Sequence, residues 1–282
     1  MFRRLYNEAI ISFEMVTISP LYIGSGDKDQ LDPAAADNTF ITMYRDGQLV
    51  PVIPGSSLKG VFRSSIEQLL PGSCDIFRNP CARDVRQKKS GRNERQGAEE
   101  SNTINYEVGR QRYRESCPAC KLFGSTVLKS RISFMDAYPV GKPRIGHRAS
   151  VAIDRITGAS RKGPLYEFEY VEDAVFKCEI RLKNFFRWHL KAVLEVFDMI
   201  DQGFVTFGGL TSKGFGHMKV RNVSLKLKYY DKNKKTPDYT EHGLFVERIV
   251  SGKENIGNLF ADVSIIDNTV LQRCDLRDDK AV

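Results

Sequence analysis

Apolar residues recur at every second position in several segments of this chain, and at helical spacing in two others. Within 10–23, for example, Ile11, Phe13 and Met15 share one face, as in a strand that buries one side. Further strands are predicted at 40–44, 49–53, 131–138, 174–182 and 216–229. Asp46-Gly47 joins the first two of these and is a strong hairpin signal, because both residues tolerate a positive φ.

Two segments show the spacing of an amphipathic helix. The first begins near residue 56, with Ser56 or Ser57 as its expected N-terminal cap, and Pro71-Gly72 ends it. The second covers 184–202. Their apolar stripes are formed by Leu58, Val61, Phe62, Ile66, Leu69 and Leu70, and by Leu190, Val193, Leu194, Phe197 and Ile200. The order strand, helix, strands, then strand, helix, strand predicts an α+β fold with a ferredoxin-like, split βαβ sheet.

Three other parts of the chain depart from this regular pattern. The segment 73–115 is polar, charged and without apolar periodicity, which indicates an insertion held at its ends by cysteines. Two strand-like arms within 147–170 surround a glycine-containing turn and predict a long projecting hairpin. After a basic linker at 232–237, the remaining residues are expected to form an appended, partly mobile tail.

Composition narrows the class of protein. With 282 residues, 41% hydrophobic and 28% charged, the chain can form one large domain, or one domain with insertions. The net charge of +8 and the pI of 9.1 suit a polyanionic partner, although many proteins carry such charge as a solvated face. The sequence has no apolar run of roughly 18 residues and no secretory signal at its start. We therefore expect a cytoplasmic protein, without a membrane span, whose thiols stay reduced.

Two segments, 51–63 and 203–216, combine glycines, small hydroxyls and a cation. Glycines let a phosphate approach the backbone, amides and hydroxyls bind its oxygens, and Lys or Arg neutralises its charge. A pair of such segments favours a polymer of phosphates, and so RNA, over a single nucleotide. The predicted RNA contacts are Ser56, Ser57, Lys59 and Arg63 in the first segment, and Gly208, Gly209 and Lys213 in the second. The alternative is an ordinary solvated helix face and a tight turn.

Four cysteines lie between these two segments. Cys117 and Cys120 have the x2 spacing of a zinc-ligand pair, and Cys74 and Cys81 are able to supply the other two ligands. We predict a structural zinc site, because the four thiols bracket a segment that has no core of its own. Such a closed site leaves no position for a substrate. The alternative is a set of buried free thiols.

The segments 21–26, 52–63 and 204–216 resemble the RAMP superfamily of CRISPR proteins, and 117–125 and 147–158 resemble its Cas-seven-like type III backbone group. The resemblance implies a modified RNA-recognition-motif sheet, and copies that stack along a guide RNA. It further implies a thumb hairpin that displaces one nucleotide at regular intervals. The implied organisation is an RNA-binding domain at 1–230, with a zinc-bearing insertion at 73–125 and a thumb at 140–172, followed by an extension at 231–282.

The resemblance also implies roles for individual residues. On the thumb, Arg148 and Arg155 are expected to contact RNA. Active relatives carry an aspartate shortly before the strand that leads into Pro-Gly-Ser-Ser, and Asp37 matches that position best, with Asp32 as the runner-up. Such a carboxylate would hold magnesium or a similar ion while a ribose 2′-hydroxyl attacks its own phosphate. Asn38 fits the pattern of the relatives, whereas Thr39 replaces a proline that is frequent there.

Four readings of the function remain. The first is a backbone subunit that binds guide RNA and cleaves target RNA, together with other copies or paralogous backbone subunits. The second is the same scaffold without cleavage. The third is a guide-processing endoribonuclease of the superfamily. The fourth, a zinc-stabilised metabolic protein that binds phosphate, lacks a nucleotide-binding fingerprint such as Gly-x-x-x-x-Gly-Lys-Ser.

Overall fold

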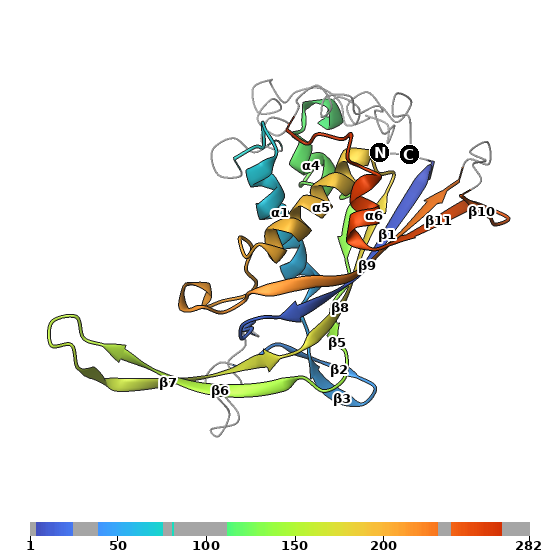
Figure 1. Cartoon of the computed structure of the whole chain (residues 1–282). Helices are drawn as coiled ribbons and strands as arrows, with labels where there is room; N and C mark the ends of the chain where they lie inside the picture. Colours follow the sequence, from blue (N-terminus) through green and yellow to red (C-terminus); the bar gives the residue numbers. More distant parts are fainter. Residues whose placement is uncertain (1–3, 25–38, 76–80, 82–111, 231–237, 267–282) are drawn as a thin grey trace, which may run out of the picture.

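The computed structural model describes residues 4–24, 39–75, 81, 112–230 and 238–266 (Figure 1). Its centre is a seven-stranded antiparallel sheet in the order β10-β11-β9-β1-β8-β4, with β5 also paired to β8. The strands are β1 (Asn7–Thr17), β4 (Ile132–Phe134), β5 (Tyr138–Pro139), β8 (Val175–Lys183), β9 (Met218–Tyr229), β10 (Thr240–Glu241) and β11 (Val246–Ser251). The predicted α+β class with an antiparallel sheet is confirmed.

Strand β1 lies in the middle of the sheet, between β8 and β9. Ile11 pairs with Ile180 on one side and Leu225 on the other. The face of β1 that holds Ile11, Phe13 and Met15 is buried, as the alternation predicts. The strand ends at Thr17, earlier than predicted, because the chain turns through Ser19 and Pro20 before it reaches the hairpin described below.

The helices α1 (Gly55–Leu69), α4 (Pro118–Phe123), α5 (Arg187–Asp201) and α6 (Lys253–Asn258) cover one face of the sheet (Figure 1). The two long helices were both predicted, and their stripes meet over β1. Phe197 of α5 packs on Phe13 at 4.7 Å and on Phe62 of α1 at 6.0 Å between ring centroids. Such pairs add stability beyond their buried area.

The predicted cap of α1 is wrong. The helix begins at Gly55 with Pro54 as its N-cap, and no side chain caps it from within the segment. Instead, the Asp136 carboxylate accepts the Gly55 N–H at 2.7 Å. Proline fixes its own φ near the value that this position needs, and Asp136 places a negative charge at the helix N-terminus. Ser56 is therefore left exposed to solvent.

Two hairpins stand apart from the sheet. The longer consists of β6 (Arg144–Ile153) and β7 (Ser160–Asp173) and extends far from the helices (Figure 1), which confirms the predicted projecting hairpin. The shorter consists of β2 (Thr42–Arg45) and β3 (Gln48–Pro51). Its turn has positive φ at both Asp46 and Gly47, as the sequence predicts.

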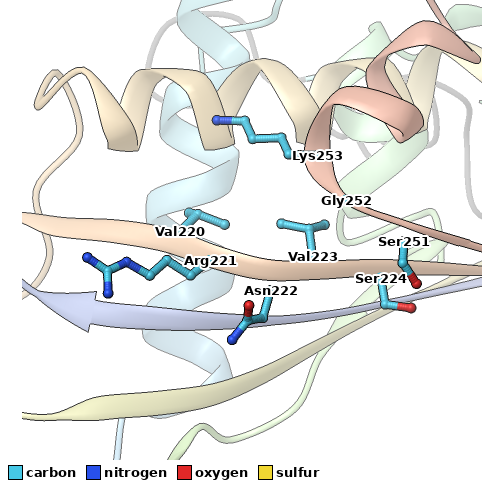
Figure 2. Close-up of a pocket in the computed structure, with 8 residues that line it drawn as sticks. All are labelled: Val220, Arg221, Asn222, Val223, Ser224, Ser251, Gly252 and Lys253. Atoms are coloured by element: carbon cyan, nitrogen blue, oxygen red, sulfur yellow. The ribbon is translucent and has the colours of Figure 1, made fainter.

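The C-terminal part corrects another expectation, because residues 238–266 are not simply appended. Strand β11 pairs with β9 and extends the sheet, and Lys253 at the start of α6 forms ion pairs with Asp198, at 2.7 Å, and Asp201 of α5. Figure 2 shows the shallow hollow left at this junction, with Val220 and Val223 directed towards the helices. The sequence analysis does not predict β11, because Glu247 and Arg248 are adjacent polar residues that interrupt the alternation of apolar and polar positions in this six-residue strand.

Within the described part of the chain, no helix has the length and apolar character needed to cross a membrane.

Candidate nucleic-acid interface and metal centre

The structure brings together the four cysteines that the sequence singled out. Cys117 is the N-cap of α4, Cys120 lies in its first turn, and Cys74 follows α1. With Cys81, their Sγ atoms all lie within 4.8 Å of one another. Cys74 and Cys120 are separated by 3.6 Å between sulphurs, far more than the roughly 2.05 Å of a disulfide. A tetrahedral metal with bonds of about 2.3 Å places its sulphurs about 3.8 Å apart, so the cluster fits a metal ion.

Hydrogen-bond donors surround these sulphurs. The Cys117 N–H donates to Cys81 Sγ at 3.2 Å, and the Cys120 N–H donates to Cys117 Sγ at 3.4 Å. The Arg63 guanidinium donates to Cys120 Sγ at 3.7 Å. None of these donors can act as an acceptor. The surroundings therefore suit thiolates, the form in which cysteine binds metals.

The cysteines shift one another's proton affinities. A hydrogen bond from Cys120 holds the pKa of Cys117 at about 4, while the same bond raises the pKa of Cys120. Burial raises the pKa of Cys81 to about 11. Because the four thiols lie so close together, ionisation of one of them disfavours ionisation of the others: each further negative charge would be repelled by the first. A bound divalent cation would remove that conflict and let all four sulphurs ionise.

The first glycine-containing segment forms the start of α1. A Cβ at Gly55 would overlap the carbonyl oxygen of Phe134, so glycine is required where the helix meets β4. Ser56 is exposed, and Ser57 and Lys59 are half-buried. Partial burial, followed by the nearby charge of Arg63, lowers the pKa of Lys59. The segment therefore presents hydroxyls and one cation beside the helix N-terminus.

Arg63, expected beside Lys59 as an RNA contact, instead has partners within the protein. Its Nε forms an ion pair with Glu67 at 2.7 Å, and its Nη1 donates to the Gly124 carbonyl at 3.2 Å. Together with the contact to Cys120 Sγ, these bonds direct the guanidinium towards the cysteine cluster. Contact between Arg63 and RNA stays a prediction.

The second glycine-containing segment, 203–216, folds back from Phe207 onwards on the residues that follow β1. The Gly209 N–H donates to the Tyr22 carbonyl and the Gly216 N–H to the Pro20 carbonyl, both at 2.8 Å. Gly208 has φ 76°, and a Cβ there would overlap the Tyr22 carbonyl oxygen. The close approach that these glycines permit is therefore to the protein's own backbone. Their predicted contact with RNA is untested, whereas Lys213 is exposed on the same loop.

Arg148 joins the hairpin to this loop. Its guanidinium lies over the rings of Tyr170, at 5.7 Å, and Phe215, at 5.3 Å. Phe168 completes the buried group, and Tyr22 packs on it. Phe215 is buried. The sequence does not reveal that the aromatic positions of β7 meet this ring, although aromatic residues alternate along that arm.

Arg155 lies at the far tip of the hairpin and is exposed. Asp154 shapes that tip by accepting the N–H groups of Ile156, at 2.8 Å, and Thr157, at 3.0 Å. Ile156 is 95% exposed. The tip therefore presents a cation and an apolar side chain to solvent, at a distance from the glycine segments.

The predicted catalytic residues Asp37 and Asp32 lie outside the described residues. The chain on either side of them is described, however. Gly24 forms an isolated bridge with Phe40, so the two ends of that interval meet. The Phe40 N–H donates to Glu169 of β7 at 3.2 Å. Both ends therefore lie at the base of the long hairpin, near Tyr22 and the glycine loop.

The α+β fold with its antiparallel sheet is consistent with the family that the comparisons with known proteins identify. The sequence model of the RAMP superfamily matches residues 14–219, so the chain belongs to that superfamily. More particularly, the chain is similar to the CRISPR system Cms endoribonuclease Csm3 of Methanocaldococcus jannaschii. The two are 28% identical over 255 residues, which cover 83% of this chain and 88% of the relative.

Proposed function

We propose that the chain is a guide-RNA-binding backbone subunit of a type III CRISPR interference complex in the cytoplasm, and that it cleaves complementary target RNA with the help of a divalent ion. Its partners are the guide, the target and other copies or paralogous backbone subunits. The observation that carries the proposal is the similarity to the endoribonuclease Csm3, which extends over 83% of this chain and 88% of the relative.

The central sheet supports a modified RNA-recognition motif. Helix α1 connects β1 to β4, and α5 connects β8 to β9, which gives the ferredoxin-like order β9-β1-β8-β4. The proposed domain is 1–230, with insertions at 73–125 and 140–172 and an extension at 231–282. In this proposal the hairpin β6–β7 is the thumb.

The open face of this sheet differs from one that stacks bases. The outward positions of β1 include Glu8, Ile10, Ser12 and Glu14, and neighbouring strands add lysines and arginines rather than aromatic rings. Recognition motifs of this kind ordinarily use aromatic residues there. The RNA is therefore proposed to run along the loops and the hairpin base, where glycines and small hydroxyls accompany the cations.

The proposed contacts divide among four places. At the start of α1, Ser56, Ser57 and Lys59 bind phosphate oxygens. On the glycine loop, Lys213 does so, and Gly208 and Gly209 let a phosphate approach the backbone. Arg148 binds phosphate at the hairpin base, and Arg155 binds near the tip. Their distribution over separate elements suits an extended strand better than a single nucleotide.

For cleavage we propose Asp37, with Asp32 as the alternative, as the ligand of a divalent ion such as magnesium. That ion would stabilise the negative charge that builds up on the phosphoryl oxygens when a ribose 2′-hydroxyl attacks the adjacent 3′-phosphate. The bond from phosphorus to the 5′-oxygen of the next nucleotide breaks, and that oxygen takes up a proton as it leaves. The protein would contribute by positioning the RNA. A thumb that displaces a nucleotide would place the 2′-hydroxyl in line with phosphorus and the leaving oxygen. The ends of the aspartate segment support this role, because they meet at the hairpin base.

For the cysteine cluster we propose a structural zinc ion. Four thiolates in tetrahedral arrangement are typical of zinc, and a four-coordinate site leaves no opening for a substrate. The ion would link the C-terminal end of α1 to α4. It would thereby attach both ends of the insertion to the rest of the domain.

The test is to purify the protein with its native partners and sequence the RNA that accompanies it. Guide-length RNAs that share a constant, repeat-derived end are expected. Random RNA, or none, would overturn the proposed backbone role.

A further inference from the structure

The side chain of Arg63 sits between α1 and the cysteine cluster and is about three-quarters buried, with 24% of its surface exposed. Each of its three nitrogens has a partner: Glu67 for Nε, the Gly124 carbonyl for Nη1 and Cys120 Sγ for Nη2. A guanidinium with its planar fork occupied in this way is fixed in position.

Four thiolates around a divalent cation leave a net charge of −2 on the cluster. Donors around the sulphurs spread this charge and hold the ligands in place. Backbone N–H groups do so at Cys81 and Cys117. At Cys120 the donor is a charged guanidinium from a different element of the fold. Arg63 therefore supplies what a buried anionic metal site requires, namely a positive charge in direct contact with a ligand.

We propose that Arg63 is a positioning residue of the metal site. Its guanidinium donates to the Cys120 sulphur, offsets part of the negative charge of the site and ties α4 to α1. This inference rests on the metal site proposed above, but not on guide binding or target cleavage. It also divides α1: Lys59, one turn earlier, serves the RNA, whereas Arg63 serves the metal.

The experiment measures how fast zinc passes from the full-length protein to a chromogenic chelator. For Arg63→Gln we expect metal affinity to fall by about 10–100-fold, the usual effect of losing such a partner, with a matching increase in the release rate. Two controls should release zinc at the rate of the unaltered protein. Arg181→Gln removes an arginine that likewise pairs through Nε with a glutamate, but on β8. Lys59→Gln removes the neighbouring cation of α1.

A second readout separates a metal role from a phosphate contact. RNA binding by zinc-saturated Arg63→Gln should retain the salt dependence of the unaltered protein, whereas Lys59→Gln should reduce it. The proposal is overturned if Arg63→Gln releases zinc at the normal rate, and a lowered salt slope would then make Arg63 a phosphate contact. If Arg63→Gln does not fold, Arg63→Lys replaces it. This variant keeps the charge but not the fork that holds three partners, so a smaller increase in the zinc release rate is expected, and a normal rate would overturn the positioning role. An unaltered protein without zinc would overturn both this inference and the metal site, and leave the RNA proposal standing.

Discussion

The guanidinium of Arg148 lies over the ring of Phe215, with 5.3 Å between its central carbon and the ring centroid. The contact joins the long hairpin to the glycine loop, two parts that are distant in the sequence. Because Phe215 is buried while Arg148 is exposed, the ring contact holds the guanidinium in place at the surface, where a phosphate is able to reach it. Such preorganisation reduces the entropy lost when the group binds a phosphate.

Replacing Arg148 by alanine should therefore weaken RNA binding. We expect a loss of about 10–100-fold, from a charged hydrogen bond worth roughly 1.5–3 kcal/mol, and a shallower salt dependence in a binding titration. Arg144→Ala is the matched control, because Arg144 lies on the same strand, is 76% exposed and pairs with Glu172. An equal loss in both variants would show that general charge, and not the stacked arginine, matters.

Gly208 should tolerate no side chain. Gly208→Ala forces a Cβ against the Tyr22 carbonyl at φ 76°, and should lower stability by about 1–3 kcal/mol. Gly214→Ala is the control: its φ is 84°, but a Cβ there would meet nothing within 4 Å. Thermal unfolding should rank Gly208→Ala clearly below Gly214→Ala. Equal melting temperatures would mean that the loop does not need this close approach.

Cys117→Ser should lose zinc and stability together, because the free energy of metal binding contributes to folding at a structural site. Metal analysis and the melting temperature of the purified protein measure both effects. The control is Cys178→Ser, since Cys178 is buried in β8 and lies outside the cluster. Loss of stability without loss of metal in Cys117→Ser would contradict a metal role for this thiol.

His189 should make folding sensitive to acid. Burial, followed by the charge of Arg131, lowers its pKa well below 6.5, so the folded state stays neutral while the unfolded state takes up a proton. Stability from this group is complete above pH about 6.5 and falls below it, by at most about 1.4 kcal/mol per pH unit. Denaturant unfolding between pH 7.5 and 5 measures this slope. In His189→Asn the slope should decrease, and an unchanged slope would assign the acid sensitivity to other groups.

The sequence predicts the core well, because burial leaves a periodic trace. Ile11, Phe13 and Met15 show the period of a strand, and the stripe around Phe197 shows that of a helix. Predictions fail where a contact is made across the fold. Asp136 takes over the role expected of Ser56, because its loop reaches the start of α1.

The candidate site shows the same division. The sequence predicts the cysteine cluster, because Cys117 and Cys120 form a close pair typical of metal ligands and the four thiols bracket a segment without a core of its own. Spacing does not reveal that Arg63 faces the cluster, since a cation one turn after Lys59 has the same pattern whichever partner it meets. The contact of Arg148 with Phe215 likewise joins a strand of the long hairpin to the glycine loop, and no periodicity links the two.

Asp37 is the residue on which the proposed cleavage depends. In the assembled complex, Asp37→Ala should reduce cleavage of a complementary RNA by about a hundredfold or more, because a lost metal ligand removes several kcal/mol of transition-state stabilisation. Binding of guide and target should remain unchanged, since the proposed phosphate contacts lie on other residues.

Asp32→Ala is the matched control, a carboxylate removed from the same segment. Cleavage is measured with labelled target RNA in the presence of magnesium and again after chelation. Loss of cleavage in Asp32→Ala, with normal cleavage in Asp37→Ala, would transfer the role to the alternative residue. Normal cleavage in both variants would remove this segment from the chemistry. If the unaltered complex binds the target but leaves it intact, the subunit is a scaffold that orders the guide, and the acidic segment has no catalytic role.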